Sequence, residues 1–392
     1  MIGITEPPPR PQGPLLRTPL FALHQAQGGH LVPFHGWELP LYYSGTGILR
    51  EHEAVRRDVG VFDVSHMGIL TLEGPGSAEL LSRRTPSNAL RGRPGQARYT
   101  CLIDPEAHLV DDALWMRTDD RSDPTNFLLV PNAGTASRIF EVLLQHRGRS
   151  CEIKQHNGAA GILAVQGPRS RELLESLFPW DLSGLLPYTG AFFPLSGTRS
   201  GGAYGGAFAV RLRDHALVSR TGYTGELGYE LFLEASRMPE VFGALLRGGA
   251  TACGLGARDT LRMEKGYLLS GVDFHGDRTP LEAGLDRFLE FDHRFVGREA
   301  LERQKTAGGY SLWTGLLGED PTAIPRHGMP LLLEGKPVGV VSSGGQSPTL
   351  KKGIALAYLP PEARTPGNSL GLSLRGREAT LQVVRLPFVR AR

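Results

Sequence analysis

Residues near the start of the chain recur at helical spacing. Positions three or four apart form one face, which consists of Ile48, His52, Val55 and Val59. This spacing predicts an amphipathic helix over residues 47–59, with Gly60 as its C-terminal cap. Residues 1–17 are studded with proline instead, which predicts a disordered or loosely docked tail.

The pattern changes from residue 61 to residue 153, where short strand-like runs surround two helical ones. The expected strands are 68–73, 98–102, 109–116, 127–130 and 151–153, and the expected helices are 77–82 and 135–145. Thr135 is a suitable N-cap for the second helix. Two helices on one face of an antiparallel sheet predict a ferredoxin-like arrangement.

A second α+β region follows from residue 159 to about residue 271. Its expected helices lie near 169–177, 236–246 and 257–265. Residues 219–230 predict a strand, a turn and a second strand, because strand-like alternation resumes at Tyr229. The evenly spaced glycines of this turn therefore do not indicate a phosphate loop, which would open a helix.

Helical periodicity ends after residue 304, and short apolar runs separated by Gly and Pro take its place. The expected strands are 328–333, 338–342, 354–359, 370–374 and 379–387. This pattern predicts a small β-barrel or sandwich. Within it, Ser342–Thr349 predicts a tight loop.

Size and composition narrow the class of protein. A chain of 392 residues is too long for one ordinary core. The net charge is +3, and no long basic run suggests nucleic-acid binding. Cys101, Cys151 and Cys253 are too widely spaced for a disulfide framework, a zinc site or an iron–sulfur cluster. Because no apolar run is long enough to span a membrane, we expect a soluble, cytoplasmic protein without a metal.

Two stretches carry candidate carboxylates. Asp111 and Asp112 are adjacent on an expected strand, so they should point to opposite faces and not form a close dyad. One of them could be a lone acid or base, and the alternative is a strand-edge turn with both side chains solvated. In the second stretch, Glu230 beside Tyr223 would suit a flat, amide-like heterocycle, and the alternative is a solvated glutamate on an edge strand.

Three further residues could contribute chemistry. Arg258 and Arg262 lie one helical turn apart and could bind an anionic group. The alternative is an ion pair with Asp259 or Glu264, as is common between domains. His66 follows Asp63 and Ser65, but catalytic triads come from distant segments, so we expect a hydrogen-bonded structural histidine there.

Taken together and in order, several motifs resemble those of the T protein of the glycine cleavage system, the tetrahydrofolate-dependent aminomethyltransferase family. They are 34–38 (FHGWE), 63–68 (DVSHMG), 111–112, 219–226, 254–259, 279–282 (TPLE), 324–328 (IPRHG) and 347–350 (SPTL). The similarity covers about residues 18–388. Each motif is weak alone, and their ordered combination is specific.

The resemblance implies a fold: a three-domain clover-leaf of the α+β class around a central folate site. It implies a discontinuous first domain, residues 18–60 plus 147–276, into which a ferredoxin-like domain, residues 61–146, is inserted. A linker and helix over 277–305 would lead to a C-terminal, jelly-roll-like β-barrel over 306–392.

The resemblance also implies a reaction and its partners. The aminomethyl group carried on the lipoyl arm of the H protein would lose ammonia and pass its one-carbon unit to tetrahydrofolate. The products would be methylenetetrahydrofolate and dihydrolipoyl H protein. The P and L proteins would be functional partners, with no nucleic acid and no membrane involved.

Residue by residue, the family's key aspartate matches Asp112, which would orient the folate, accept a proton and stabilise positive charge. The pterin-binding glutamate matches Glu230, and the arginine on the folate side matches Arg258. The positions that line the pocket match Tyr99, Leu114, Asn132 and Tyr223, and possible further lining residues are Met67 and Arg262.

Two alternatives belong to other classes. The first is a folate-binding module without transferase activity; its iron–sulfur assembly members carry Lys-Gly-Cys, where this chain has Lys265, Gly266 and Tyr267. Relatives fused to amine dehydrogenases need a flavin domain, for which no sequence is left. The second alternative is a related tetrahydrofolate-dependent demethylase, which would also keep Asp112.

Overall fold

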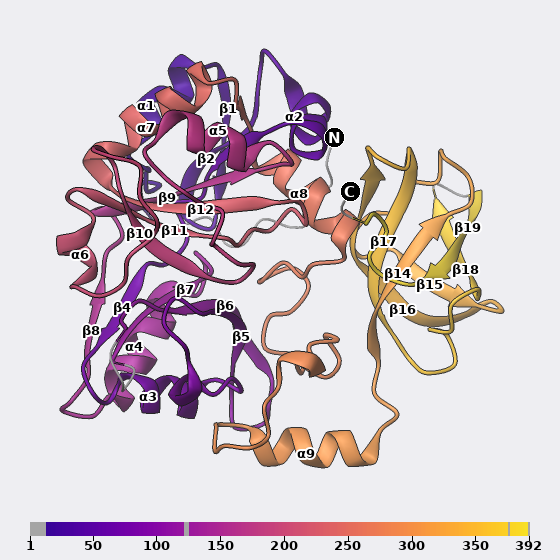
Figure 1. Ribbon diagram of the computed structural model, residues 1–392. Helices are drawn as coiled ribbons and strands as arrows, with labels where there is room; N and C mark the ends of the chain where they lie inside the picture. The colour runs from indigo at the N-terminus through magenta and orange to yellow at the C-terminus, as the bar shows by residue number, and fades with distance from the viewer. Residues whose placement is uncertain (1–12, 121–124, 375–376, 391–392) are drawn as a thin grey trace.

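The computed structural model describes residues 13–120, 125–374 and 377–390. It confirms an α+β protein whose three lobes meet near the centre of the molecule (Figure 1). The predicted tail lies outside the described residues as far as residue 12. Its last part is docked, because the amide of Leu16 donates to Gly36 O and its carbonyl accepts from the amide of Glu38.

The first lobe consists of two segments of the chain, which flank the inserted lobe. Its main sheet has the order β10-β11-β12-β9-β3-β13. The strands are β3 (Gly60–Asp63), β9 (Ala160–Gln166), β10 (Gly190–Pro194), β11 (His215–Ser219), β12 (Gly228–Glu234) and β13 (Thr251–Ala252), and a separate ribbon pairs β1 (Gly29–Phe34) with β2 (Trp37–Tyr43). The helices are α1 (Phe21–Ala26), α2 (Gly47–Arg57), α5 (Ser170–Leu177), α6 (Phe208–Arg211), η2 (Ala235–Arg237), α7 (Met238–Arg247) and α8 (Leu255–Lys265).

The prediction that Gly60 caps α2 is wrong. The helix ends at Arg57, and Gly60 is the first residue of β3. A side chain at this position would come within 2.5 Å of the Val55 side chain and 2.7 Å of Cys253 Sγ. The glycine is therefore needed for close packing of the strand against α2.

The inserted lobe, residues 70–155, carries the ferredoxin-like arrangement. Its sheet has the order β5-β6-β7-β4-β8. Without β5, the order β8-β4-β7-β6 is that of a ferredoxin-like sheet, so β5 is an additional edge strand. The elements are β4 (Leu70–Glu73), α3 (Ser77–Arg84), η1 (Ala89–Arg91), β5 (Ala97–Ile103), β6 (Leu109–Arg117), β7 (Asn126–Pro131), α4 (Ala136–His146) and β8 (Glu152–Gln155).

Strand pairing shifts both expected borders of this lobe, 61 and 146. β3 pairs with β9 in the first lobe, and β8 pairs with β4 in the inserted lobe. The two connecting segments lie side by side, because the amide of His156 donates to Ile69 O at 2.8 Å and Asn157 Nδ2 donates to Met67 O at 2.8 Å. The chain thus enters and leaves the inserted lobe at one place.

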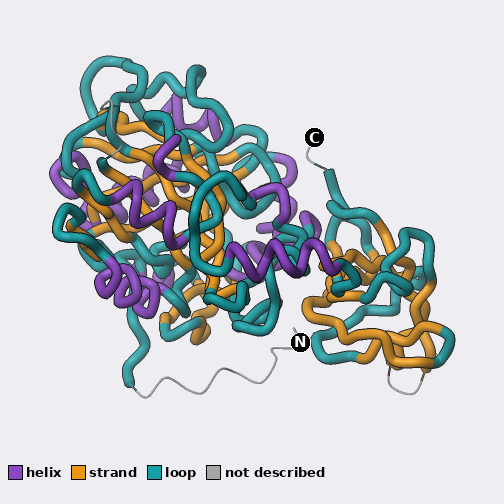
Figure 2. Tube along the Cα trace, turned by 90° about the horizontal axis from the view of Figure 1, so that it is seen from below, coloured by secondary structure: helices purple, strands orange, loops and turns teal. Residues whose placement is uncertain are grey.

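The C-terminal lobe is a closed barrel of order β14-β17-β16-β15-β18-β19, which confirms the predicted β-barrel. Its strands are β14 (Leu312–Gly318), β15 (Pro330–Leu333), β16 (Lys336–Ser347), β17 (Lys352–Leu359), β18 (Ser369–Leu374) and β19 (Arg377–Val384). The loop predicted over Ser342–Thr349 is wrong, because β16 continues to Ser347 after a bulge near Val341. The linker holds η3 (Asp286–Phe288) and α9 (Arg298–Ala307). Seen from below, the barrel stands to one side of the two lobes that contain most helices (Figure 2).

A hydrophobic cluster joins all three lobes beside α8. It combines Cys101 and Leu109 of the inserted lobe with Met263 of α8 and with Trp313 and Leu356 of the barrel. Burial of this shared apolar surface holds the three lobes in fixed relative positions. Side chains at the junction of the three lobes are therefore held on rigid elements.

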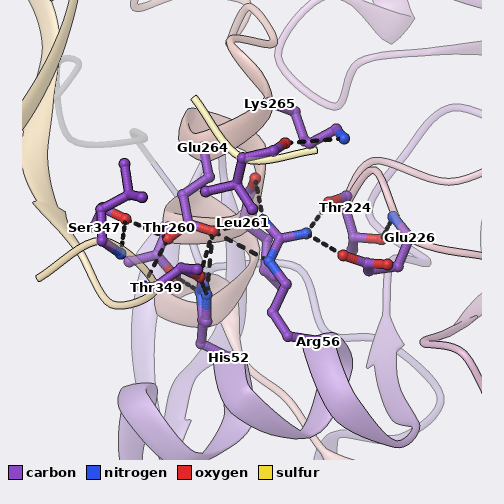
Figure 3. Close-up of polar contacts among 12 residues, drawn as sticks. His52, Arg56, Thr224, Glu226, Thr260, Leu261, Glu264, Lys265, Ser347 and Thr349 are labelled. Carbon is purple, nitrogen blue, oxygen red and sulfur yellow. Dashed lines mark hydrogen bonds and ion pairs between the residues drawn. The ribbon is translucent and has the colours of Figure 1, made fainter. Parts of the chain in front are cut away.

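A buried polar cluster around Glu264, shown in Figure 3, also fastens the barrel to α8. The Glu264 carboxylate is fully buried and accepts hydrogen bonds from Ser347 Oγ at 2.5 Å, Thr349 Oγ1 at 2.9 Å and Arg56 Nη2 at 2.7 Å. His52 Nε2 lies 3.3 Å from the same carboxylate. We call these five residues the Glu264 brace.

Among the residues that the structure describes, no helix is both long enough and apolar enough to cross a bilayer.

Candidate functional site

The first wall of the candidate site is the β5–β6 hairpin of the inserted lobe. Asp112, on β6, is buried. Its Oδ2 accepts a hydrogen bond from the Tyr99 hydroxyl at 2.8 Å, and its Oδ1 accepts one from Asn132 Nδ2 at 2.7 Å. Tyr99 comes from the neighbouring strand and Asn132 follows β7. Two neutral donors therefore hold both oxygens of one carboxylate.

This environment raises the pKa of Asp112 to near neutral pH. Burial raises its pKa, the charge of Asp111 raises it further, and the hydrogen bonds from Tyr99 and Asn132 oppose the change. The resulting pKa is about 7. A carboxyl group of this kind can both accept and return a proton under physiological conditions.

Asp111 and Asp112, predicted to point to opposite faces without forming a close dyad, both bind the side-chain amide of Asn132. Asp111 is fully buried, and its carboxylate also accepts from Asn132 Nδ2, at 2.8 Å. The pairing of β6 with β5 skips Val110, which is a bulge immediately before the two acids. Asn132 lies beyond the end of β7, from where its amide reaches both carboxylates.

The second wall is the strand–turn–strand of the first lobe, which confirms the prediction for residues 219–230. Glu230 is paired with Ser219 across β11 and β12, and it accepts a hydrogen bond from Thr221. Within the described parts of the chain, Thr221 is its only hydrogen-bond donor. Burial raises the pKa of Glu230. With one donor, its carboxylate keeps further acceptor capacity.

Tyr223 and Arg258 complete this wall. The Tyr223 ring stacks on Tyr267 with centroids 5.7 Å apart, and its hydroxyl donates to Leu268 O. The Arg258 guanidinium, on α8, lies 4.6 Å from the Tyr223 ring centroid. No carboxylate or carbonyl among the described residues accepts a hydrogen bond from it.

Arg258 also connects the two walls electrostatically. Burial lowers its pKa, and the nearby charges of Tyr223, Glu230 and Asp112 raise it. The same positive charge acts on Glu230, whose pKa it lowers. The structure thus brings together the predicted residues Tyr99, Asp112, Asn132, Tyr223, Glu230 and Arg258. Met67 and Leu114 are partly buried, and each packs against the neighbouring hydrophobic cluster.

The chain matches known proteins over nearly its whole length. A family model described as "GCVT N-terminal domain" matches residues 20–293, and one described as "Glycine cleavage T-protein C-terminal barrel domain" matches residues 313–390. The chain belongs to the glycine cleavage T-protein family. The domain order found in the fold, an α+β part followed by a barrel, agrees with these two matches.

Similar proteins of this family are named aminomethyltransferases, and a solved structure among them has the same fold. An aminomethyltransferase of Halothermothrix orenii is 39% identical over 381 residues, covering 95% of this chain and 99% of that protein. One of a Synechococcus species is 40% identical over 380 residues, with the same coverage. The crystal structure of the glycine cleavage system aminomethyltransferase T of Bartonella henselae, 32% identical, superposes with a TM-score of 0.85 and covers 96% of this chain and 99% of its own. The present chain is therefore an aminomethyltransferase of the glycine cleavage system.

Arg262 lies close enough to Tyr223 for its charge to act on that residue's pKa, but its own donors are engaged elsewhere. It is 2% exposed, and its donors are engaged by Asp259 Oδ1 at 2.8 Å, Asp273 Oδ2 at 2.8 Å and Ser343 Oγ at 2.8 Å. These contacts fasten α8 to the following segment and to β16. The alternative of an ion pair with Asp259 is present in the structure, and a lining role of Arg262 stays a prediction.

His66 is not the hydrogen-bonded histidine that we expected. It is 2% exposed, and its Nδ1 has no hydrogen-bond partner among the described residues. Burial and the charge of Arg258 lower its pKa to about 3, so the ring is neutral. Asp63 instead lies 2.9 Å from His24 Nε2, which also excludes a triad of Asp63, Ser65 and His66.

Sequence reasoning missed three residues that shape the site. Thr221 binds Glu230, Tyr267 stacks on Tyr223, and Ser270 binds Asp111 at 2.9 Å. Thr221 could have been found, since it lies in the turn that leads to Glu230. The other two come from the segment after α8 and carried no local signal. No group of three or more His, Cys, Asp or Glu side chains is placed to hold a metal ion in the described ranges.

Proposed function

We propose that Asp112 is the catalytic group with which this aminomethyltransferase transfers a one-carbon unit from the lipoyl arm of H protein to tetrahydrofolate. The observation that supports this most directly is the buried Asp112 carboxyl, held by Tyr99 and Asn132 with a pKa of about 7. It is a group whose proton is exchangeable at working pH and whose position is fixed.

The opposite wall fits a folate. A pterin is flat and carries adjacent N–H donors, which suit the two oxygens of Glu230. The Tyr223 ring gives an aromatic surface, and the unpaired Arg258 guanidinium suits an anionic or electron-rich part of the ligand. When bound, tetrahydrofolate supplies the nitrogen atoms that take up the one-carbon unit.

The residues then have distinct tasks. The Asp112 carboxylate stabilises positive charge that develops on the transferred carbon and takes up or returns a proton as ammonia leaves. Tyr99 and Asn132 keep its two oxygens in place. Glu230, Tyr223 and Arg258 orient the acceptor so that it reaches the donor in a productive geometry.

The proposal includes a partner and a location. The donor arm is carried by lipoylated H protein, and the P and L proteins act before and after this step. We place the enzyme in the cytoplasm. Three free, buried cysteines, Cys101, Cys151 and Cys253, are in keeping with a reducing compartment.

The test is reconstitution with aminomethyl-loaded H protein and tetrahydrofolate, with ammonia and methylenetetrahydrofolate measured together. Equal amounts of the two products are expected. Binding of folate without ammonia release would instead favour a folate-binding module. Folate-dependent removal of a methyl group from another donor, with loaded H protein inert, would favour a demethylase.

A further inference from the structure

Asp111 occupies a position that the proposed chemistry does not use directly. Its side chain has no solvent exposure. Its carboxylate nevertheless accepts three hydrogen bonds: from the Asn132 amide at 2.9 Å, from Asn132 Nδ2 at 2.8 Å and from Ser270 Oγ at 2.9 Å. A buried carboxylate with this many donors is a built feature of the fold, because an unsatisfied one would be very costly.

Asn132 is the link between Asp111 and Asp112. Its Nδ2 group lies within hydrogen-bond distance of Asp111 Oδ1, Asp112 Oδ1 and Asp112 O, at 2.8, 2.7 and 2.9 Å. Asn132 lies in the loop between β7 and α4, outside any strand or helix. The orientation of its side chain is therefore set by its hydrogen bonds. Asp111 holds both the main chain and the side chain of Asn132, and thereby aims the amide at Asp112.

Ser270 brings a second lobe into this arrangement. It lies in the segment that follows α8, is 7% exposed, and reaches Asp111 across the border between the first and inserted lobes. The same segment is fixed by Asp273, which accepts from the Leu269 amide at 2.8 Å. The orientation of Asn132 therefore depends on the correct seating of the two lobes.

We propose that Asp111 and Ser270 are positioning residues, which lock Asn132 and through it hold the Asp112 carboxylate in its reactive orientation. This inference rests on the proposed role of Asp112. Removing the hydrogen-bonded partner behind a metal ligand typically costs roughly 10–100-fold in affinity or activity, and we expect an effect of similar size behind Asp112.

The charges around Asp112 also support an influence of Asp111 on it. The titratable or charged groups that act on Asp112 or respond to it are Tyr99 and Cys101 on β5, Asp111 on β6, Tyr223 on the opposite wall and Arg258 on α8. After burial, the charge of Asp111 is the largest influence that raises the pKa of Asp112. Removal of that charge lowers the pKa of Asp112.

The experiment compares Asp111→Asn and Ser270→Ala with the wild-type enzyme. The rate of ammonia release at saturating loaded H protein and tetrahydrofolate is measured from pH 5 to pH 9. Separately, the titration of Asp112 is followed by NMR of carboxyl-labelled aspartate in the substrate-free protein, with Asp112→Asn to assign the signal.

Asp111→Asn should lower kcat roughly tenfold to a hundredfold and move both the acid limb of the rate profile and the NMR midpoint to lower pH. Ser270→Ala should lower kcat about threefold to tenfold with little change in KM. Ser236→Ala, at an exposed serine far from Asp112 in sequence, is the control.

The outcomes separate the two proposals. An unchanged NMR midpoint together with unchanged kcat in Asp111→Asn would overturn the positioning role. If Asp111→Asn does not fold, unchanged kcat in Ser270→Ala overturns it. A shifted NMR midpoint with an unshifted rate profile would support the coupling and show that Asp112 is not the group whose titration controls the rate.

Discussion

Two buried carboxylates near α8, Glu264 and Asp112, differ in the charge of their partners. Glu264 is bound by the Arg56 guanidinium and lies 3.3 Å from His52, besides its hydroxyl donors. Asp112 has two neutral donors and a negative neighbour, Asp111. Although burial acts against it, the contacts of Glu264 with His52, Ser347 and Arg56 lower its pKa to about 2, whereas the pKa of Asp112 is raised to about 7.

The difference shows that burial alone does not decide what a carboxylate can do. A carboxylate with cationic partners stays ionised and serves as a permanent fastening between lobes. One whose hydrogen-bond donors are all neutral keeps a proton available near neutral pH. In this enzyme the first kind is Glu264 on α8 and the second is Asp112 on β6.

The largest effect is expected for Asp112→Asn. Ammonia release from loaded H protein should fall about 10²–10⁴-fold, because the amide can neither exchange the proton nor carry the negative charge. Folate binding should remain measurable, since Glu230, Tyr223 and Arg258 are unchanged. Asp214→Asn, at a highly exposed carboxylate, is the matched control, and turnover equal to wild type in Asp112→Asn would remove Asp112 from the chemistry.

Glu264→Gln should act on stability instead. Removing one partner of a buried ion pair costs roughly 3–5 kcal/mol in the free energy of unfolding, because Arg56 loses its main buried counter-ion. Denaturant unfolding at pH 7 measures this change. The control Glu53→Gln breaks an exposed pair with Arg57 and should cost less than about 0.5 kcal/mol; equal losses in both variants would contradict the brace.

The pH dependence of stability should have opposite signs at the two sites. Glu264 titrates at about 2 when folded against 4.5 for an ordinary glutamate, so its stabilisation is complete above 4.5 and is lost as the pH falls towards 2. Asp112 titrates at about 7 when folded against 3.8, so its ionisation costs stability increasingly as the pH rises from 3.8 to 7.

The measurement is the unfolding free energy of each variant relative to wild type across this range. The pH-dependent part of the loss in Glu264→Gln, about 3 kcal/mol, should disappear as the pH falls from 4.5 towards 2. Asp112→Asn should become more stable than wild type as the pH approaches 7. Parallel pH trends in the two variants would refute the distinction between the sites.

Glu230→Gln should have the smallest effect. Replacing one acceptor oxygen by an amide should weaken tetrahydrofolate affinity about tenfold with a lesser change in the rate at saturation. A fluorescence titration measures the affinity. Glu234→Gln lies on the same strand four residues further along, and equal affinities in the two variants would exclude Glu230 from the folate site.

Much of this comparison could be predicted from local sequence. The strand that carries Asp112, the turn before Glu230 and the helix that carries Arg258 all follow from periodicity and turn residues. The role of Glu264 could not, because its partners come from α2 and from the barrel segment that includes Ser347. A polar residue on a helix gives no sign of which distant side chains will meet it.

The errors have a similar cause. Gly60 is suited to a helix cap by its residue type, but contacts with Val55 and Cys253 decide its position. Alternation along a strand separated Asp111 from Asp112, but Asn132, from beyond the end of β7, reaches both carboxylates. Predictions from residue type and periodicity failed where contacts with residues distant in the sequence determine the conformation.

The pairing of β4 with β8 has a consequence for how the chain folds during synthesis. β3 must pair with β9, from which it is separated by about 100 residues, and closing so long a loop is entropically unfavourable. The inserted lobe can form first and, in doing so, brings Leu70 opposite Gln155. Only a few residues then separate β3 from β4 and β8 from β9. Folding of the inserted lobe therefore holds β3 and β9 close together and speeds their pairing in the first sheet.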